Sequence, residues 1–288
     1  MTVTRARTLG FCPGVRRAVE TAERAAARAA GSGSGSGGFV LGQIVHNPRV
    51  SARLAGLGMA TIDAPDDASG RLAGATVVIR SHGAAPEVVE RLRAAGAEVV
   101  DATCPRVAAN QKAAAAYAAR GYLVVIAGDK GHGETLGVAG HAPGAVIVSS
   151  AAEAASVPTD RPLALIAQTT VSEAEYEAVR DALRSRRPDL VDVGGVCAAS
   201  RERRAAVEEL AGEVDAVVVV GGKNSANTRR LAELAASLGV PAWHVENAAE
   251  IPDELGRYGR VGLSAGASTP DEDIDEAEAR LLELGRNA

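Results

Sequence analysis

Gly10-Phe11-Cys12-Pro13-Gly14-Val15-Arg16-Arg17-Ala18-Val19-Glu20 is the stretch of sequence from which the rest of the chain can be interpreted. A short β-like segment gives way here to an alanine-rich helical pattern, with Cys12 at the junction. Pro13 suits the first helical position, where a missing N–H costs nothing. The exposed amides and the positive dipole end of a helix favour an anion such as a thiolate. The stretch therefore predicts a chemically active cysteine at the start of a helix.

The same construction occurs twice more. Residues 99–103 predict a strand end, which Cys104 and Pro105 follow with a helical run to Gly121. Residues 190–193 and a turn at 194–196 lead to Cys197 and a helix through Leu210. The three cysteines, at positions 12, 104 and 197, are the only ones in the chain and lie 92 and 93 residues apart. A fixed period of this kind indicates repeated structural units.

The pattern of the three cysteines is compatible with three roles. A single one would be most simply explained as a small buried hydrophobe. A disulfide framework is disfavoured, because the count is odd and the N-terminus does not resemble a secretory signal. Metal binding is favoured, either zinc with one open position or a [4Fe–4S] cluster with its fourth iron open to a substrate. The spacing does not choose between zinc and the cluster.

Composition narrows the class of protein. The chain has 288 residues, a formal net charge of −5 and a pI of about 5.7, which argues against a nucleic-acid-binding protein. No apolar run is long enough to span a membrane, and aromatic residues make up only 2%, which disfavours a base-stacking surface. We expect a soluble, cytoplasmic α/β protein with no nucleic-acid or membrane partner.

Apolar runs alternate with helical patterns along the whole chain, which predicts parallel sheets covered on both faces. The Gly/Ser-rich segment 31–38 has the composition of a flexible surface loop. The expected strands are residues 39–45, 75–80, 99–103, 122–127, 163–167, 190–193, 216–220 and 260–263.

Polar residues cluster just after these strands, at the edge where parallel sheets bind ligands. His46, His82 and His132 each follow a strand and suit anion binding or proton relay, although any one alone could be an ordinary loop histidine. Glu134 could deliver protons, or could simply be a solvated loop carboxylate.

Two further loops, 221–227 and 264–270, precede helices and offer N–H groups and hydroxyls to a phosphate. For Ser268 or Thr269 the simpler alternative is a helix N-cap before Pro270. Two such loops together favour a diphosphate site.

Taken together, the motifs resemble the 4-hydroxy-3-methylbut-2-enyl diphosphate reductase family of the methylerythritol phosphate route to isoprenoids. The resemblance extends over nearly the whole chain, in the family's order. It is carried by GFCPGVRRAVE, GQIVHNP, RSHG, DATCP, GHGE, QTT, the third cysteine loop, GGKNSANTRRL and SAGAS.

The resemblance implies a trefoil of three pseudo-repeated α/β domains with small parallel sheets around a central [4Fe–4S] cluster. Their expected limits are 13–103 with the Gly/Ser loop, 104–196, and 197–288 joined by the N-terminal segment 1–12. It implies that Cys12, Cys104 and Cys197 hold the cluster, which favours iron over zinc.

The resemblance also implies the residue roles and the reaction. Glu134 would be the proton source, with His132 assisting and Thr169 positioning the substrate. The residues expected to bind the substrate are His46, His82, His132, Thr169, Thr170, Ser225, Ala226, Asn227 and Ser268. The reaction is a two-electron, two-proton removal of an allylic hydroxyl, giving isopentenyl and dimethylallyl diphosphates with electrons from ferredoxin or flavodoxin.

Four positions depart from the family pattern. Gln43 stands for a usual glutamate, Gly133 for a usual proline, Ala226 for a usual serine, and Pro13 is an uncommon neighbour of the first cysteine. Ala226 removes a hydroxyl from the diphosphate loop, which bears on the affinity for the anion or on its identity. Two alternatives stay open. One is a paralogue with the same cluster acting on another phosphorylated substrate, and the other is an iron–sulfur diphosphate sensor without turnover.

Overall fold

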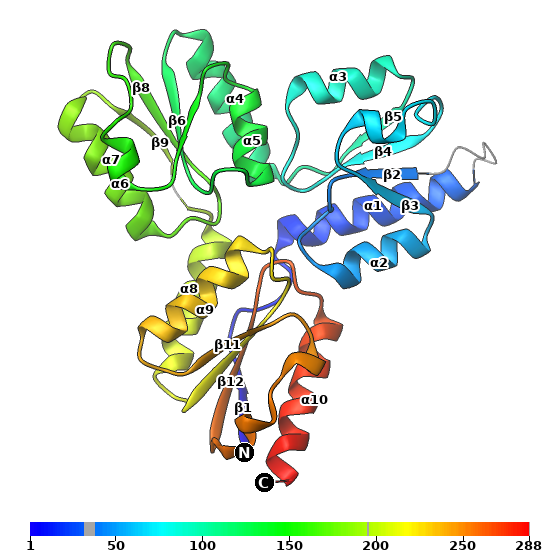
Figure 1. Ribbon diagram of the computed structural model, residues 1–288, viewed down its shortest axis with the longest axis vertical. Coiled ribbons are helices and arrows are strands. Elements are labelled where there is room, and N and C mark those ends of the chain that lie inside the picture. Colours follow the sequence, from blue (N-terminus) through cyan, green and yellow to red (C-terminus); the bar gives the residue numbers. More distant parts are fainter. Residues whose placement is uncertain (32–37, 195, 288) are drawn as a thin grey trace. The chain divides into compact units, whose positions relative to one another are not determined.

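The computed structural model describes residues 1–31, 38–194 and 196–287, and within them the strands form three parallel sheets of four strands each (Figure 1). The expected α/β class is therefore confirmed. Most of the proposed Gly/Ser surface loop, and Gly195 of the turn before Cys197, lie outside the described residues. No helix in the described ranges combines the length and apolarity that crossing a membrane requires.

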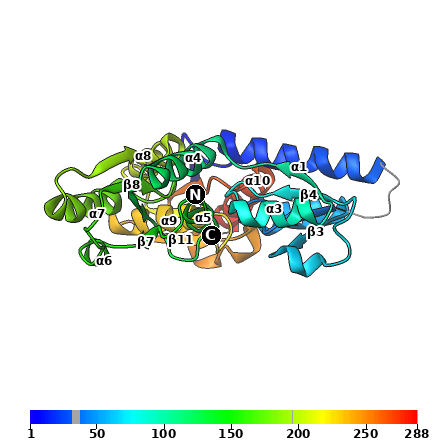
Figure 2. The ribbon, with the colours of Figure 1, turned by 90° about the horizontal axis from the view of Figure 1, so that it is seen from above.

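The first sheet has the strand order β3-β2-β4-β5. Its strands are β2 (Gly38–Leu41), β3 (Met59–Ile62), β4 (Thr76–Ile79) and β5 (Glu98–Asp101). The accompanying helices are α1 (Pro13–Gly31), α2 (Pro48–Gly56), the 3₁₀ turn η1 (Pro65–Ala68) and α3 (Pro86–Ala94). Side chains alternate along β2 and β4, so that every second one packs on the face of the sheet that contacts Leu92 of α3 and the others point to the opposite face. The side chains on both faces are buried. Figures 1 and 2 place α1 and α3 on opposite sides of this sheet, so both faces are covered.

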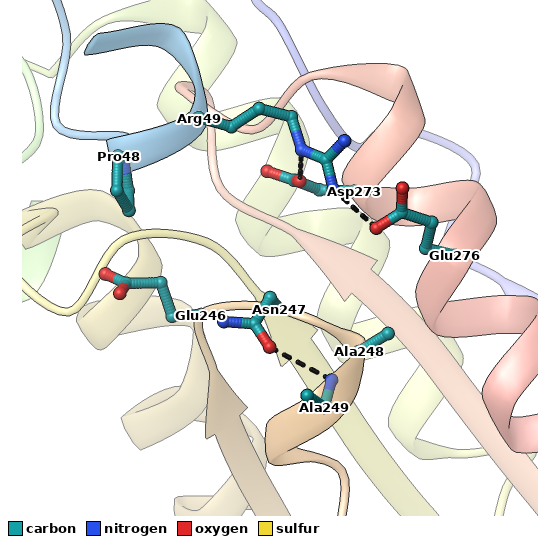
Figure 3. A pocket seen from close by; sticks show the side chains of 8 residues that line it. All are labelled: Pro48, Arg49, Glu246, Asn247, Ala248, Ala249, Asp273 and Glu276. Atoms are coloured by element: carbon teal, nitrogen blue, oxygen red, sulfur yellow. Dashed lines mark hydrogen bonds and ion pairs between the residues drawn. The ribbon is translucent and has the colours of Figure 1, made fainter. Parts of the chain in front are cut away.

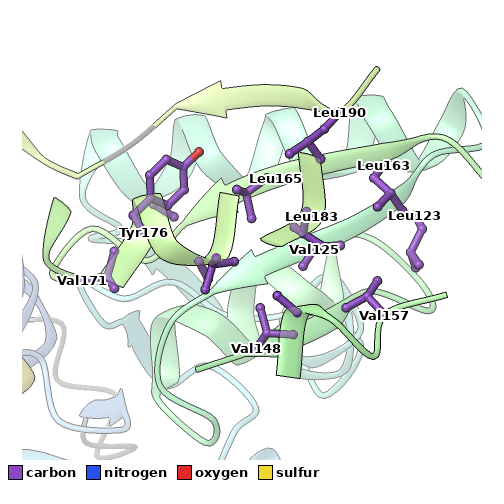
Figure 4. Packing of buried hydrophobic residues seen from close by; sticks show 14 of the residues in the cluster. Leu123, Val125, Val148, Val157, Leu163, Leu165, Val171, Tyr176, Leu183 and Leu190 are labelled. Carbon is purple, nitrogen blue, oxygen red and sulfur yellow. The ribbon is translucent and has the colours of Figure 1, made fainter. Parts of the chain in front are cut away.

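The second sheet repeats this order as β7-β6-β8-β9. Its strands are β6 (Leu123–Ala127), β7 (Val146–Val148), β8 (Leu163–Ala167) and β9 (Val191–Gly194). Its helices are α4 (Pro105–Ala119), α5 (Gly133–Gly140), α6 (Ala151–Ala154) and α7 (Glu173–Arg186). One face packs Val125 and Leu165 against Tyr176 and Leu183 of α7 (Figure 4). The other face packs against α4 and α5.

The third sheet has the order β1-β12-β10-β11. Its strands are β1 (Thr2–Arg5), β10 (Ala216–Val220), β11 (Ala242–Val245) and β12 (Arg260–Ala265). Its helices are α8 (Ala198–Ala211), α9 (Ala226–Ser237), α10 (Asp271–Asn287) and the 3₁₀ turns η2 (Ala248–Glu250) and η3 (Asp253–Arg257). The N-terminal strand β1 pairs in parallel with β12 and fills the place that β5 and β9 hold in their sheets. All three sheets therefore share one arrangement of parallel strands, although the edge strand of the third sheet comes from the N-terminus.

One strand expected from the sequence is wrong in extent. The predicted strand 39–45 ends at Leu41, because Gly42 adopts φ +68° and turns the chain away from the sheet. The residues that follow, up to His46, therefore form a loop.

The described chain divides into two compact units, each considered by itself below. The first unit comprises Met1–Arg16, His46–Val50 and Ala198–Ala288. The second comprises Arg17–Val45 and Ser51–Cys197. The three domain limits expected from the sequence stay a prediction.

Candidate functional site

The structure places each cysteine immediately before a helix. Cys12 precedes α1, Cys104 is the N-cap residue of α4, and Cys197 precedes α8. All three lie in the described residues, are partly exposed and form no disulfide. The amide of Val15, in the first turn of α1, points to the Cys12 sulfur at 3.4 Å. Each thiol thus lies at a positive helix end, a setting that suits a metal or cluster ligand.

A backbone hydrogen bond ties each cysteine to a polar loop that follows a neighbouring strand. In the first unit, the Cys12 amide donates to the Ala267 carbonyl (3.2 Å). In the second, Cys104 donates to Ser81 (2.9 Å) and Cys197 to Thr169 (3.2 Å). The loops containing SAGAS, RSHG and QTT thus help to fix the positions of the cysteines.

Glu134 is the most deeply buried acid of the second unit, with 1% of its surface exposed. Both carboxylate oxygens accept hydrogen bonds from one residue: Oε1 from the Thr169 amide and Oε2 from the Thr169 hydroxyl, each at 2.7 Å. Because Thr169 adjoins β8 and Glu134 lies in the first turn of α5, the second sheet positions this pair. The alternative of a solvated loop glutamate is therefore wrong.

Burial raises the pKa of Glu134 to about 7, because the charged form loses its hydration. The two hydrogen bonds from Thr169 oppose this shift, and the negative charge of Asp129 adds slightly to it. A carboxyl group with a pKa near neutral holds a proton part of the time at pH 7, which is what a proton donor needs.

The same pKa predicts how stability depends on pH. Glu134 in the unfolded chain titrates near 4.5, so its contribution to stability is fully present below pH 4.5 and is lost as the pH rises through 7. We expect the free energy of unfolding to lose about 3 kcal/mol from this group across that window. Urea unfolding of the parent and of Glu134→Gln checks this, because the difference in their stabilities should change with pH by that amount. Glu87→Gln, which changes an exposed carboxylate, is the control and should follow the pH dependence of the parent. If the unfolding free energy of Glu134→Gln varied with pH as that of the parent does, the assignment would be contradicted.

His132 caps α5, and its ring nitrogen Nδ1 accepts the Glu134 amide at 3.1 Å. Since Nδ1 is an acceptor, the neutral ring carries its proton on Nε2, where it can be donated. The His82 ring lies edge-to-face with the His132 ring, with centroids 5.0 Å apart. The structure thus brings the rings of these two histidines together.

Gln168, whose contribution was not anticipated from the sequence, supports this part of the site. It is 1% exposed, accepts the Asp129 amide (2.7 Å) and donates to the Thr170 hydroxyl (2.8 Å). Thr170 therefore has its hydroxyl oriented by Gln168, which leaves its own O–H to donate elsewhere. A polar residue directly after the buried strand β8 was the available sequence signal.

The guanidinium of Arg80 packs against the glycine at position 133. A Cβ at Gly133 would lie 2.6 Å from Nη2 of Arg80, and one at Gly42 would lie 2.3 Å from Nη1. Burial lowers the pKa of Arg80, with the charge of Asp63 acting in the opposite direction. The guanidinium therefore occupies space that a side chain at either glycine would need.

The first unit brings the two polar loops of the third sheet together. Ser225 caps α9, its Oγ accepting the Thr228 amide (3.3 Å) and hydroxyl (2.9 Å). The Ser268 hydroxyl approaches both Ser225 Oγ (3.5 Å) and the His46 carbonyl (3.3 Å). His46, Ser225 and Ser268 thus meet within one unit.

The side-chain amide of Asn227 indicates that a ligand binds here. Its side chain is 7% exposed, and its buried Nδ2 has no hydrogen-bond partner among the described residues. A buried donor of this kind costs free energy unless a ligand or water satisfies it. Its place in the first turn of α9 suits an anion.

The N-cap alternative for Ser268 and Thr269 is wrong. Helix α10 begins at Asp271, and the Thr269 hydroxyl donates instead to the Val220 carbonyl at the end of β10 (2.9 Å). Lys223, also in the loop before α9, donates to the His244 carbonyl (2.6 Å) and pairs with Glu250 (2.7 Å). Neutral donors, rather than Lys223, are thus available to an anion here.

A groove of about 490 Å³ in the first unit is a poor diphosphate site (Figure 3). Three carboxylates, Glu246, Asp273 and Glu276, line it beside the single cation Arg49. The surplus of negative charge would repel a diphosphate.

The fold and the cysteines define a class of α/β proteins built on three like parallel sheets, with three helices each preceded by a cysteine. The family model described as LytB protein matches residues 3–282. The chain belongs to the LytB family.

Curated relatives extend over nearly the whole chain. The 4-hydroxy-3-methylbut-2-enyl diphosphate reductase of Treponema denticola is 45% identical over 98% of this chain and 100% of its own length. That of Anaeromyxobacter sp. is 44% identical over 99% of both chains. These relatives are oxidoreductases by name.

Solved structures agree with the fold. The structure of (E)-4-hydroxy-3-methyl-but-2-enyl diphosphate reductase, the terminal enzyme of the non-mevalonate pathway, is 36% identical with a TM-score of 0.66, covering 98% of this chain and 100% of that chain. The Plasmodium falciparum E-1-hydroxy-2-methyl-but-2-enyl-4-diphosphate reductase shares the fold with a TM-score of 0.87 at 24% identity, covering 96% and 86%.

Proposed function

We propose that this chain is a 4-hydroxy-3-methylbut-2-enyl diphosphate reductase acting in the non-mevalonate pathway to isoprenoids. The allylic C–O bond breaks, and the oxygen leaves as water after taking up one proton. Two electrons and the second proton go to the allylic carbon skeleton, which gives isopentenyl and dimethylallyl diphosphates. The observation that carries this proposal is the buried Glu134, with a pKa of about 7, held at both oxygens by Thr169.

Cys12, Cys104 and Cys197 would hold a [4Fe–4S] cluster. The donor set fits, because three thiols at helix starts suit three irons and leave the fourth without a protein ligand. When bound, the cluster supplies electrons and a Lewis acid for the hydroxyl. The family resemblance favours this over zinc.

Glu134 holds one of the two protons that the reaction consumes. In the ionised state, Thr169 donates to both carboxylate oxygens. In the protonated state, a proton on Oε2 can be donated to the Thr169 hydroxyl oxygen, since a hydroxyl both donates and accepts. Thr169 therefore accommodates Glu134 before and after proton transfer without moving.

Diphosphate binding is assigned to neutral donors. In the first unit these are Ser225, Ser268, the imidazole of His46 and the amide of Asn227, whose Nδ2 has no partner in the part of the chain that the structure describes. In the second unit they are the His82 and His132 rings and the Thr170 hydroxyl, while Thr169, whose own hydroxyl donates to Glu134, positions the substrate. Charged donors are not required, because helix N-termini and orphaned amides stabilise anions.

Ala226→Ser tests the departure closest to Asn227. Ala226 is the first residue of α9 and is 6% exposed, so a serine there returns one hydroxyl to the diphosphate loop. A hydrogen bond to a charged group contributes about 1.5–3 kcal/mol, much of which water recovers. We expect KM for the diphosphate to fall about three- to fivefold with kcat little changed, because a remote contact binds ground and transition states alike. Weaker binding in steady-state assays at matched iron content would instead favour the paralogue.

The proposed reduction needs an electron donor and takes place in a particular cell compartment. A ferredoxin or flavodoxin would supply the electrons, and the enzyme would act in the cytoplasm. The sensor alternative is disfavoured, because a sensor has no use for a buried proton donor.

The testing experiment incubates anaerobically purified, cluster-loaded protein with the allylic diphosphate and a strong one-electron reductant. Isopentenyl and dimethylallyl diphosphates are the expected products, and binding without product would support the sensor.

A further inference from the structure

Asn47, the residue after His46, is 1% exposed, and both the oxygen and the nitrogen of its side-chain amide are hydrogen-bonded. Its Oδ1 accepts the Val50 amide (3.0 Å) at the start of α2. Its Nδ2 donates to Oδ2 of Asp273 (3.0 Å), 226 positions further along the chain. The orientation of the Asn47 side chain is therefore fixed by two partners.

Asp273 is a buried carboxylate with 3% of its side chain exposed. It lies in the first turn of α10, where the helix dipole stabilises negative charge. Its other oxygen pairs with Nε of Arg49, whose Nη2 also reaches Glu276 at 2.5 Å (Figure 3). Both oxygens of Asp273 thus hold the segment that directly follows His46.

The backbone of His46 is held from a second direction. Its carbonyl accepts the Ser268 hydroxyl, and a Cβ at Gly222 would lie only 2.3 Å from that carbonyl oxygen. The segment 46–49 is therefore fixed against both loops that carry Ser225 and Ser268.

We propose that Asp273 and Asn47 are positioning residues for diphosphate binding, which hold His46 at a fixed place beside Ser225 and Ser268. This inference rests on the proposed function. Neither residue needs to touch the substrate. Loss of their mutual hydrogen bond would let the His46 segment shift, so diphosphate affinity should fall while the proton chemistry at Glu134 continues.

The test compares Asp273→Asn with Glu276→Gln. Both variants remove an α10 carboxylate that pairs with Arg49. Only Asp273→Asn also places an amide NH2 against one of the two donors that Asp273 accepts, Nδ2 of Asn47 or Nε of Arg49, so one of the contacts that hold the His46 segment is lost. For Asp273→Asn we expect Kd for inorganic pyrophosphate and KM for the diphosphate substrate to rise about five- to twentyfold, with kcat within about twofold. Glu276→Gln should match the parent. Pyrophosphate binding is measured by titration calorimetry.

Exchanging the two side chains separates positioning from mere stability. Asn47→Asp alone places two carboxylates opposite each other and should bind pyrophosphate worse than Asp273→Asn. The double variant Asn47→Asp/Asp273→Asn restores a carboxylate–amide hydrogen bond and still caps α2, so binding should recover. Asn47→Ser keeps the cap but cannot reach Asp273, and provides a second test if Asp273→Asn does not fold.

The outcomes are distinguishable. A parent that binds pyrophosphate, with variants that lose thermal stability yet bind equally well, would overturn the inference and leave the proposed function standing. A parent that neither binds pyrophosphate nor converts the substrate would overturn the proposed function and this inference with it.

Discussion

Glu134→Gln is expected to bind the diphosphate as the parent does while losing about a hundred- to ten-thousand-fold in turnover. The amide has the shape of the carboxylic acid, so it can still accept the Thr169 amide and donate to the Thr169 hydroxyl. What it lacks is a proton that it can transfer. Single-turnover rates, measured at matched iron content, give the loss in the chemical step, and pyrophosphate titration shows that binding persists.

Thr169→Val is the control for this experiment. Valine retains the backbone N–H bond to Oε1 but removes the hydroxyl bond to Oε2, one of the two contacts that lower the pKa of Glu134. Its activity should persist to higher pH than that of the parent, because the proton is lost at a higher pH. Turnover of Glu134→Gln at the parent rate would place the proton on another group, with His132 or bound water as the next candidates.

Local signals explain why much of the fold was predictable from the sequence. Proline after Cys12 and Cys104 marks the first turn of a helix, and apolar runs such as residues 163–167 and 216–220 coincide with β8 and β10. The end of β2 was mispredicted, because Gly42 leaves the sheet where Arg80 packs against it, a contact set by the tertiary structure. The short strands β1, β3, β7 and β11 are not predicted, because three or four residues carry little pattern, and the pairing of β1 with β12 joins segments far apart in the sequence.

The site shows the same division between local and long-range information. The helix starts, the strand-end histidines and Glu134 follow from local patterns and the family resemblance. The pKa of Glu134 does not, because it depends on a burial of 99% and on Thr169, 35 positions away. Asp273 appears in the sequence as one of several acids opening a helix, and nothing near it indicates that Asn47 is its partner. Long-range polar pairs of this kind can be recognised only in the folded structure.

Replacing any one of Cys12, Cys104 or Cys197 with serine is expected to strip the anaerobically purified protein of its brown colour and most of its iron. The parent should carry a [4Fe–4S] cluster, and a serine hydroxyl is a much poorer iron ligand than a thiolate. The chain has no fourth cysteine, so no other thiol can take over. Activity should be lost together with the iron.

Serine is also the right replacement structurally, because it is a favoured residue before a helix and should leave α1, α4 and α8 intact. Circular dichroism should therefore match that of the parent while iron analysis and visible absorbance do not. Ala198→Ser, at the first position of α8 beside Cys197, is the matched control and should keep its iron. Colourless parent protein carrying one zinc per chain would contradict the cluster. The three thiols would then be a zinc site on a shared fold, and Glu134 would need a different role, because zinc cannot supply the electrons that the reduction consumes.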